Sequence, residues 1–141
     1  MRIQVKKIRD VQLPSYSHAG DSGADLVNAG ETTVLKAGER KIFPSGIKVA
    51  IPQGYEIQVR SRSGLAIKKG IMVLNSPGTI DAGYRGEVGV ILLNTSDKDV
   101  EIKQGMKLAQ AVLQKVEKIS WEETDKLPET TRGSGGFGST G

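Results

Sequence analysis

The segment 75–86 of this chain carries an acid and a tyrosine among turn-forming residues. Asp81 in an Asp-x-Gly turn commonly bonds its own backbone, whereas an immobilised carboxylate could orient or deprotonate a water molecule. Tyr84 could pack as a lid on core residues, or it could present its ring to a sugar. The segment taken alone does not decide between a structural and a catalytic turn.

Arg62, Ser63 and Gly64 form a second candidate, suited to an anion. Ser63 is predicted to cap a short helix over residues 63–70, exposing backbone N–H groups and the positive end of the helix dipole. Arg62 could add a bidentate guanidinium contact to phosphate oxygens. The competing interpretation is a plain helix cap beside a solvated arginine.

Two further polar residues, Asp25 and Gln110, interrupt small or apolar runs. Burying either without a partner would be costly, so each makes an interior structural hydrogen bond or contributes to a site. His18 is expected to be a surface loop residue without a role.

The last ten residues, 132–141, contain five glycines. A generic tail of this kind stays disordered because glycine loses the most backbone entropy on ordering. Here Arg132 and Phe137 suit a segment that folds onto a phosphorylated ligand with a flat ring. The Gly-x-Gly-x-x-Gly spacing in the tail does not indicate a dinucleotide fold, because it does not join a strand to a helix.

Composition limits the chemistry further. The 141 residues include no cysteine and one histidine, which excludes thiolate sites and makes a Ser-His-Asp triad nearly impossible. A catalytic base would then be a carboxylate, and a metal would be a hard, oxygen-bound cation such as Mg²⁺. The formal net charge of +4 suits a small anionic ligand at least as well as a nucleic acid.

The elements that must position these residues are short strands. Apolar and polar residues alternate over 3–6, 47–51, 55–60 and 88–92, with Gly and Pro turns between them, which predicts an all-β sandwich, jelly roll or barrel. Residues 108–119 fit a helical face as well, but their β context favours a strand. No apolar run reaches membrane-spanning length and the N-terminus lacks a signal-peptide pattern, so a cytoplasmic protein is expected. With 4% aromatic residues, the core is expected to be aliphatic and modest.

Five segments resemble, in order and spacing, the five motifs of the trimeric dUTP pyrophosphatases (dUTPases). They are residues 19–26, 62–66, 78–86, 105–110 and 132–141. The resemblance implies a jelly-roll-like β-barrel over residues 1–128, assembled as a homotrimer with active sites at subunit interfaces. It also implies that residues 129–141 form a flexible Gly-rich arm that closes over the site of a neighbouring subunit.

The resemblance assigns roles around the nucleoside. It implies that Asp81 activates the attacking water and meets the deoxyribose 3′-OH, and that Tyr84 stacks under the deoxyribose and excludes a 2′-OH. Phe137 would cap the uracil face. Backbone groups of a narrow hairpin would read the uracil edge, with substrate contacts at Asn75, Gly78, Thr79 and Ile80.

Roles around the phosphates follow from the same resemblance. Asp25 would bind waters of a Mg²⁺ hydration shell, so the metal would touch substrate and water rather than side chains. The triphosphate would be held by Arg62, Ser63, Gly64 and Gln110. The arm would close over it with Arg132, Gly138, Ser139 and Thr140.

The activity so implied is Mg²⁺-dependent hydrolysis of dUTP to dUMP and pyrophosphate, which limits uracil in DNA and supplies dUMP for thymidylate synthesis. No membrane or direct nucleic-acid partner is expected. The alternatives are a dCTP deaminase, a bifunctional deaminase–dUTPase, and a non-catalytic nucleotide-binding barrel. The chain departs from the family pattern at Ser61, where proline is common, and at Met106 and Lys107, where an acid and an arginine are common. A salt bridge made there would be altered or absent.

Overall fold

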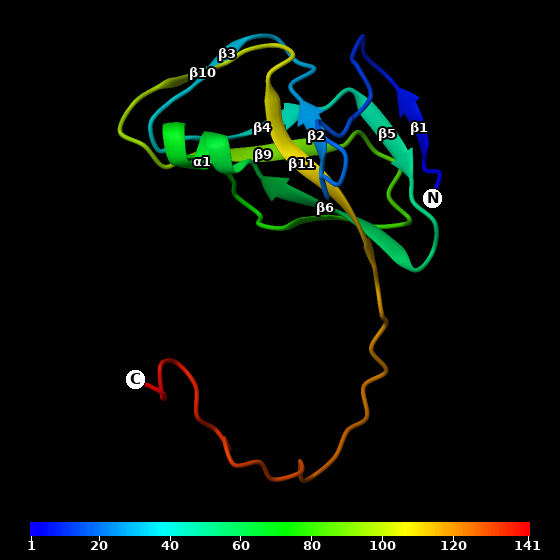
Figure 1. Cartoon of the computed structure of the whole chain (residues 1–141), viewed down its shortest axis with the longest axis vertical. Coiled ribbons are helices and arrows are strands. Elements are labelled where there is room, and N and C mark those ends of the chain that lie inside the picture. The colour runs from blue at the N-terminus through cyan, green and yellow to red at the C-terminus, as the bar shows by residue number, and fades with distance from the viewer.

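Eleven short strands and one helix make up the body of the chain in the computed structural model, which describes all 141 residues (Figure 1). The strands predicted from alternation are present as β1, β5, β6 and β9. The strands are β1 (Gln4–Lys7), β2 (Ala24–Val27), β3 (Thr33–Leu35), β4 (Arg40–Pro44), β5 (Ile47–Ala50), β6 (Tyr55–Ser61), β7 (Ile71–Val73), β8 (Gly78–Ile80), β9 (Gly89–Asn94), β10 (Val100–Ile102) and β11 (Lys107–Lys115).

All strand pairs are antiparallel. The largest sheet has four strands in the order β2-β11-β6-β8, and a second has three in the order β4-β9-β7. Two strand pairs, β1-β5 and β10-β3, complete the set. The mostly-β class with one short helix is confirmed, and the four sheets do not join into one continuous hydrogen-bonded barrel.

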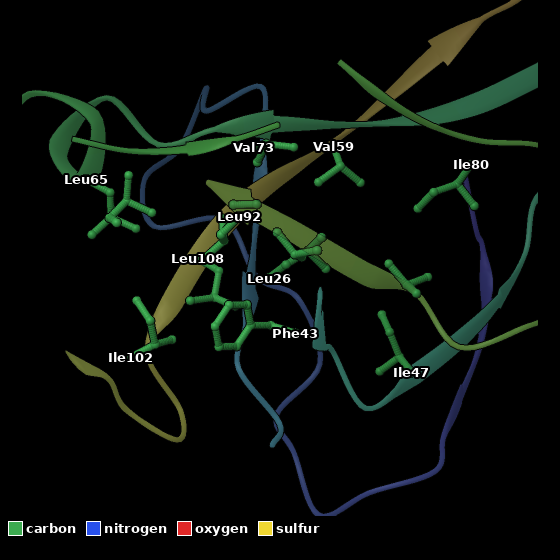
Figure 2. Close-up of a cluster of buried hydrophobic side chains, with 14 of the residues drawn as sticks. Leu26, Phe43, Ile47, Val59, Leu65, Val73, Ile80, Leu92, Ile102 and Leu108 are labelled. Atoms are coloured by element: carbon green, nitrogen blue, oxygen red, sulfur yellow. The ribbon is translucent and has the colours of Figure 1, made fainter. Parts of the chain in front are cut away.

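The core is a cluster of 18 buried apolar residues contributed by the two larger sheets and the elements around them. Figure 2 shows Val59 and Ile80 of the four-stranded sheet facing Leu92 of the three-stranded sheet. Phe43 is the one aromatic side chain in the cluster, so packing is almost entirely aliphatic, as predicted. Because β11 lies between β2 and β6, this sheet brings Asp25, Gln110 and Arg62 into one region.

The single helix, α1 (Ser63–Lys69), ends as predicted but begins differently. Gly70 adopts the left-handed conformation (φ 64°) and its N–H bonds the carbonyl of Ala66. The prediction of Ser63 as a side-chain cap is wrong, because Arg62 occupies the N-cap position and no side chain caps the helix. The Arg62 guanidinium turns instead toward Asp25.

The chain beyond β11 has no helix or strand. Strand β11 confirms the β interpretation of this region over residues 107–115 and excludes the helix. Figure 1 shows the following segment leaving the body and curving back on itself without returning to the sheets. No helix in the structure has the length and apolar character to cross a membrane.

Candidate active site

The carboxylate of Asp25 lies at the centre of a buried polar cluster. Its side chain is only 5% exposed, and Lys107 Nζ lies 2.7 Å from Oδ2. The hydroxyl of Ser17 donates to the same oxygen at 3.0 Å, while Arg62 Nε lies 3.3 Å from Oδ1. Strand pairing creates the cluster, because β2 carries Asp25 alongside β11, which begins at Lys107.

These partners determine the charge state of the buried acid. Burial alone raises the pKa of Asp25, but the bonds from Lys107 and Ser17 and the nearby charge of Arg62 outweigh it and lower the pKa below its ordinary value. Asp25 is therefore ionised at neutral pH. Two cations face one carboxylate, which leaves the cluster with one net positive charge, a suitable environment for a phosphate group.

The departure at Lys107 does not remove the ion pair. A salt bridge altered by the lysine is consistent with the structure, because Lys107 reaches Asp25 at the shortest ion-pair distance in the chain. Met106 supplies its backbone instead, and its carbonyl accepts the N–H of Asn28 at 2.9 Å. At the other departure, the Ser61 hydroxyl accepts the N–H of Val73 at 2.9 Å, tying β6 to β7.

Gln110 lies in the same region. It is opposite Asp25 across one side of β11 and opposite Arg60 across the other, so the three side chains share one face of the sheet. Its side chain covers Gly23, where an added Cβ would come within 2.8 Å of Gln110 Cβ. The glycine therefore leaves the space that Gln110 needs.

Asp81 lies in a different place, in the turn after β8. The N–H of Tyr84 bonds the Asp81 carbonyl at 3.0 Å and closes the turn. The Asp81 side chain makes no hydrogen bond or ion pair with any other residue. The structural interpretation, in which this carboxylate caps its own backbone, is therefore not what the chain adopts.

Tyr84 is held at one end and open at the other. Its hydroxyl donates to the carbonyl of Glu87 at 2.9 Å, while 46% of the residue is exposed. The ring lies over Gly86, where a side-chain Cβ would overlap the phenol. The turn thus carries a partly exposed aromatic ring three residues after Asp81.

The narrow hairpin expected before Asp81 is not formed, because β7 and β8 belong to different sheets and residues 74–77 connect them. The chain is nevertheless closely packed at Gly78. A Cβ on Gly78 would lie 3.2 Å from the side-chain nitrogen of Asn75 and 3.3 Å from Val59 Cβ. In β8, Thr79 points outward and is exposed, whereas Ile80 is buried in the core. In this segment Asn75 and Thr79 are therefore the exposed candidates, whereas Gly78 and Ile80 are buried.

Asp81 also borders a cleft of about 290 Å³. Tyr55 and Glu56 of β6 form one wall, and Val116 and Lys118, at the start of the tail, form another. The segment that follows β11 is anchored at its start, because the N–H of Val116 bonds the carbonyl of Gly54 at 2.9 Å.

The structure does not bring the two groups of candidates together. Asp25 and Asp81 lie at opposite corners of the four-stranded sheet, three inter-strand spacings apart. Asp25 is level with Arg60 through Gln110, whereas Asp81 continues β8 to the level of Glu56. With strands about 4.8 Å apart and about 3.3 Å per residue, the two carboxylates are separated by roughly 20 Å.

The tail candidates lie apart from both groups. Arg132 Nε bonds the carbonyl of Gly135 at 2.9 Å, and the other tail hydrogen bonds are equally local. Phe137 is fully exposed, with a φ of 49°. Gly138, Ser139 and Thr140 are likewise exposed.

Sequence reasoning missed Ser17 as a partner of Asp25. Nothing in the motif spacing marks it, since an isolated bridge between Ser15 and Asp25 brings its loop to β2. His18 is exposed, as expected, and its Nδ1 lies 3.4 Å from the carboxylate of Asp21.

The donor set permits magnesium only in an indirect mode. No group of three or more acidic or histidine side chains is placed to hold a metal ion. Asp25 Oδ1 is buried and accepts no hydrogen bond, so it retains an acceptor for a metal-bound water once Arg62 moves. The residues present therefore fit an ion held chiefly by phosphate oxygens and water, an arrangement common for Mg²⁺.

The fold and these residues define a mostly-β protein with a buried cluster of one acid and two cations, and a separate turn carrying a free carboxylate. The dUTPase family model matches residues 9–141, so the chain belongs to the dUTPase family. Deoxyuridine 5′-triphosphate nucleotidohydrolases of Rickettsia typhi and Helicobacter pylori are each 49% identical, covering 100% of this chain and 97% of the relative. The enzyme of Rickettsia bellii is 52% identical, covering 99% of this chain and 95% of the relative.

Solved structures agree in fold. The Staphylococcus bacteriophage 80alpha dUTPase, solved with dUPNHPP, is 27% identical and superposes with a TM-score of 0.90, covering 99% of this chain and 98% of that chain. A variant dUTPase of phage phi11 of S. aureus, which coordinates a structural Mg(II) ion, is 25% identical with a TM-score of 0.83, covering 92% of this chain and 100% of that chain.

Proposed function

We infer that this chain hydrolyses dUTP to dUMP and pyrophosphate. The observation that supports this most directly is Asp81, whose backbone is held in a turn and whose carboxylate has no partner in the chain and borders a cleft. Full-length relatives named for this reaction, at about half identity, identify the substrate. The enzyme would limit uracil in DNA and supply dUMP, and we expect it to act in the cytoplasm.

Asp81 acts as the base. Its carboxylate accepts a proton from, or orients, a water molecule within hydrogen-bond reach. The Tyr84 ring packs under the deoxyribose, where a 2′-OH would collide with it. The backbone of the segment beside Asn75, Gly78, Thr79 and Ile80 reads the edge of uracil.

The phosphate chain binds at the other group. The first N–H groups of α1, on Ser63 and Gly64, have no acceptor within the helix, and Arg62 and Gln110 add side-chain donors. Mg²⁺, when bound, neutralises phosphate charge, and Asp25 would accept hydrogen bonds from its water ligands. Arg62 would then exchange its contact with Asp25 for one with phosphate.

The separation of the two groups supports a homotrimer with shared sites. About 20 Å is too far for Asp81 and the Asp25 cluster of one chain to act on the same phosphate, because catalysis requires hydrogen-bond reach. A neighbouring subunit brings the two groups together. The body, residues 1–128, adopts the family's jelly-roll-like arrangement, and the arm, residues 129–141, closes over a neighbour's site with Arg132, Phe137, Gly138, Ser139 and Thr140.

The test is pyrophosphate release from dUTP, dCTP, dTTP and UTP with Mg²⁺, comparing wild type with Asp81→Asn. We expect release from dUTP, reduced at least about a thousandfold by Asp81→Asn because the base is lost, with dUTP affinity largely retained. Asp97→Asn is the matched control, since Asp97 is also an exposed turn carboxylate without a hydrogen bond or ion pair.

Each alternative gives a different result. Ammonia released from dCTP would assign the chain to the deaminases. Binding of dUTP without turnover would indicate a nucleotide-binding module. Full activity in Asp81→Asn would remove Asp81 from the role of base.

A further inference from the structure

Glu87 is held more firmly than an ordinary surface acid. Arg9 grips its carboxylate with two nitrogens, Nε at 2.9 Å and Nη2 at 3.3 Å, and the N–H of Gly46 donates to it at 3.0 Å. Its side chain is 24% exposed. The bond from Arg9 chiefly lowers the pKa of Glu87, against the opposing effect of burial, so the pair stays charged at neutral pH.

The backbone beside Glu87 is equally fixed. Val88 is buried, its N–H bonds the carbonyl of Ile47 at 2.9 Å, and its own carbonyl accepts the N–H of Ser45 at 3.0 Å. The segment containing Arg9 is tied to the same turn, because the N–H of Ile8 bonds the carbonyl of Gly46 at 2.9 Å. Together these contacts make a rigid block from three parts of the chain distant in sequence.

The block receives the hydroxyl of Tyr84. That bond, to the Glu87 carbonyl at 2.9 Å, is the only hydrogen bond of the Tyr84 side chain. The ring otherwise rests on Gly86, which offers no side chain to restrain it. Its position therefore depends on the position of the Glu87 carbonyl.

We propose that Glu87 and Arg9 are positioning residues that hold the Tyr84 ring at the height where it discriminates deoxyribose from ribose. This inference rests on the proposed hydrolysis of dUTP. Neither residue touches the substrate; both act through the Tyr84 hydroxyl. A displacement of about 1 Å at a substrate-contacting ring is enough to lose specificity, because steric exclusion of one hydroxyl depends on such distances.

The experiment measures kcat and KM for dUTP and UTP in wild type and Glu87→Ala. We expect the ratio of kcat/KM for dUTP over UTP to fall about tenfold, mainly through a rise in kcat/KM for UTP, because a displaced ring no longer excludes the 2′-OH, while kcat for dUTP changes little since Asp81 is untouched. Glu87→Gln, which retains an acceptor for Arg9 and Gly46, should recover part of the ratio. Glu101→Ala removes another exposed ion pair, with Lys103 at 3.7 Å, and is the control.

A double-mutant cycle with Tyr84→Phe distinguishes positioning from general loosening. Tyr84→Phe already cuts the link to Glu87, so adding Glu87→Ala should lower the ratio by less than twofold more. If Glu87→Ala does not fold, Arg9→Met keeps the Gly46 contact and should lower the ratio severalfold.

An unchanged ratio in Glu87→Ala and Arg9→Met, with wild type active, would overturn this inference alone and leave the ion pair a structural clamp. Fully additive losses in the cycle would overturn it too. A wild-type chain that does not hydrolyse dUTP would overturn the proposed function itself.

Discussion

Replacing Lys107 with methionine isolates the electrostatic part of the Asp25 cluster, because methionine keeps most of the side-chain volume. Removing one partner of a buried ion pair typically costs about 3–5 kcal/mol. Here Lys107 is 45% exposed and Arg62 remains beside Asp25, so solvent screening and the second cation reduce the loss. We expect the free energy of unfolding to fall by about 2 kcal/mol.

The loss should depend on pH with a definite sign. The folded pKa of Asp25 lies below the unfolded value of about 3.9, so the stabilisation is present above that value and disappears as the pH falls through the folded pKa. The difference between wild type and Lys107→Met should therefore be largest near neutral pH and shrink below about pH 4.

The measurement is thermal and urea unfolding at a fixed protein concentration, because the proposed trimer would make the midpoint concentration-dependent. A loss of about 2 kcal/mol corresponds to roughly 8 °C in Tm for a chain of this size. The control is Lys103→Met, the same substitution at an exposed pair 3.7 Å from Glu101, which should change stability by less than about 0.5 kcal/mol. Equal effects of the two substitutions at pH 7 would refute the account of the cluster.

Three further predictions concern the core, the arm and the turn. Leu92→Ala, at a side chain with no exposed area, should cost about 3 kcal/mol in unfolding experiments, whereas Ile67→Ala on the exposed face of α1 should cost under about 0.5 kcal/mol. Residues 130–141 make only local hydrogen bonds, so deleting them should leave Tm within about 2 °C. The deletion should lower kcat/KM at least about a hundredfold. Loss of folding would contradict this prediction. Gly86→Ala should displace the Tyr84 ring and raise KM for dUTP about tenfold in steady-state assays, and an unchanged KM would exclude ring contact with the substrate.

Alternation predicted β1, β5, β6 and β9 but did not mark β2, β3 and β10. Strands β5 and β9 alternate between buried and less buried residues, and this is the pattern that alternation detects. Strand β2, with three consecutive buried residues including Asp25, has no such alternation, and β3 and β10 have only three residues each. Short or doubly covered strands depend on their partners, which local sequence does not reveal.

The candidate site shows the same limit. The isolated acid in an apolar run marked Asp25 as a residue that needs a partner, and the structure supplies three. Their identity follows from the register of β2 with β11 and from a loop bridge, neither of which has a local signature. Local sequence also predicted Ser63 as the helix cap, because serine is a common cap. In the structure Arg62 occupies the cap position, and its pairing with Asp25 depends on the sheet.

The two carboxylates illustrate how one chain assigns opposite duties to the same functional group. Asp25 is buried, and burial is possible only because Lys107, Ser17 and Arg62 compensate its charge, so its contacts stabilise the fold in addition to the phosphate-side role proposed for it. Asp81 is exposed, so it needs no compensation and keeps both oxygens available for a water molecule. Asp81→Asn should therefore lower turnover with little effect on Tm. Lys107→Met should lower Tm more than it lowers turnover. If Asp81→Asn and Lys107→Met both changed only turnover, or both changed only Tm, the two carboxylates would share one role, and the separation of the two groups on the sheet would be refuted.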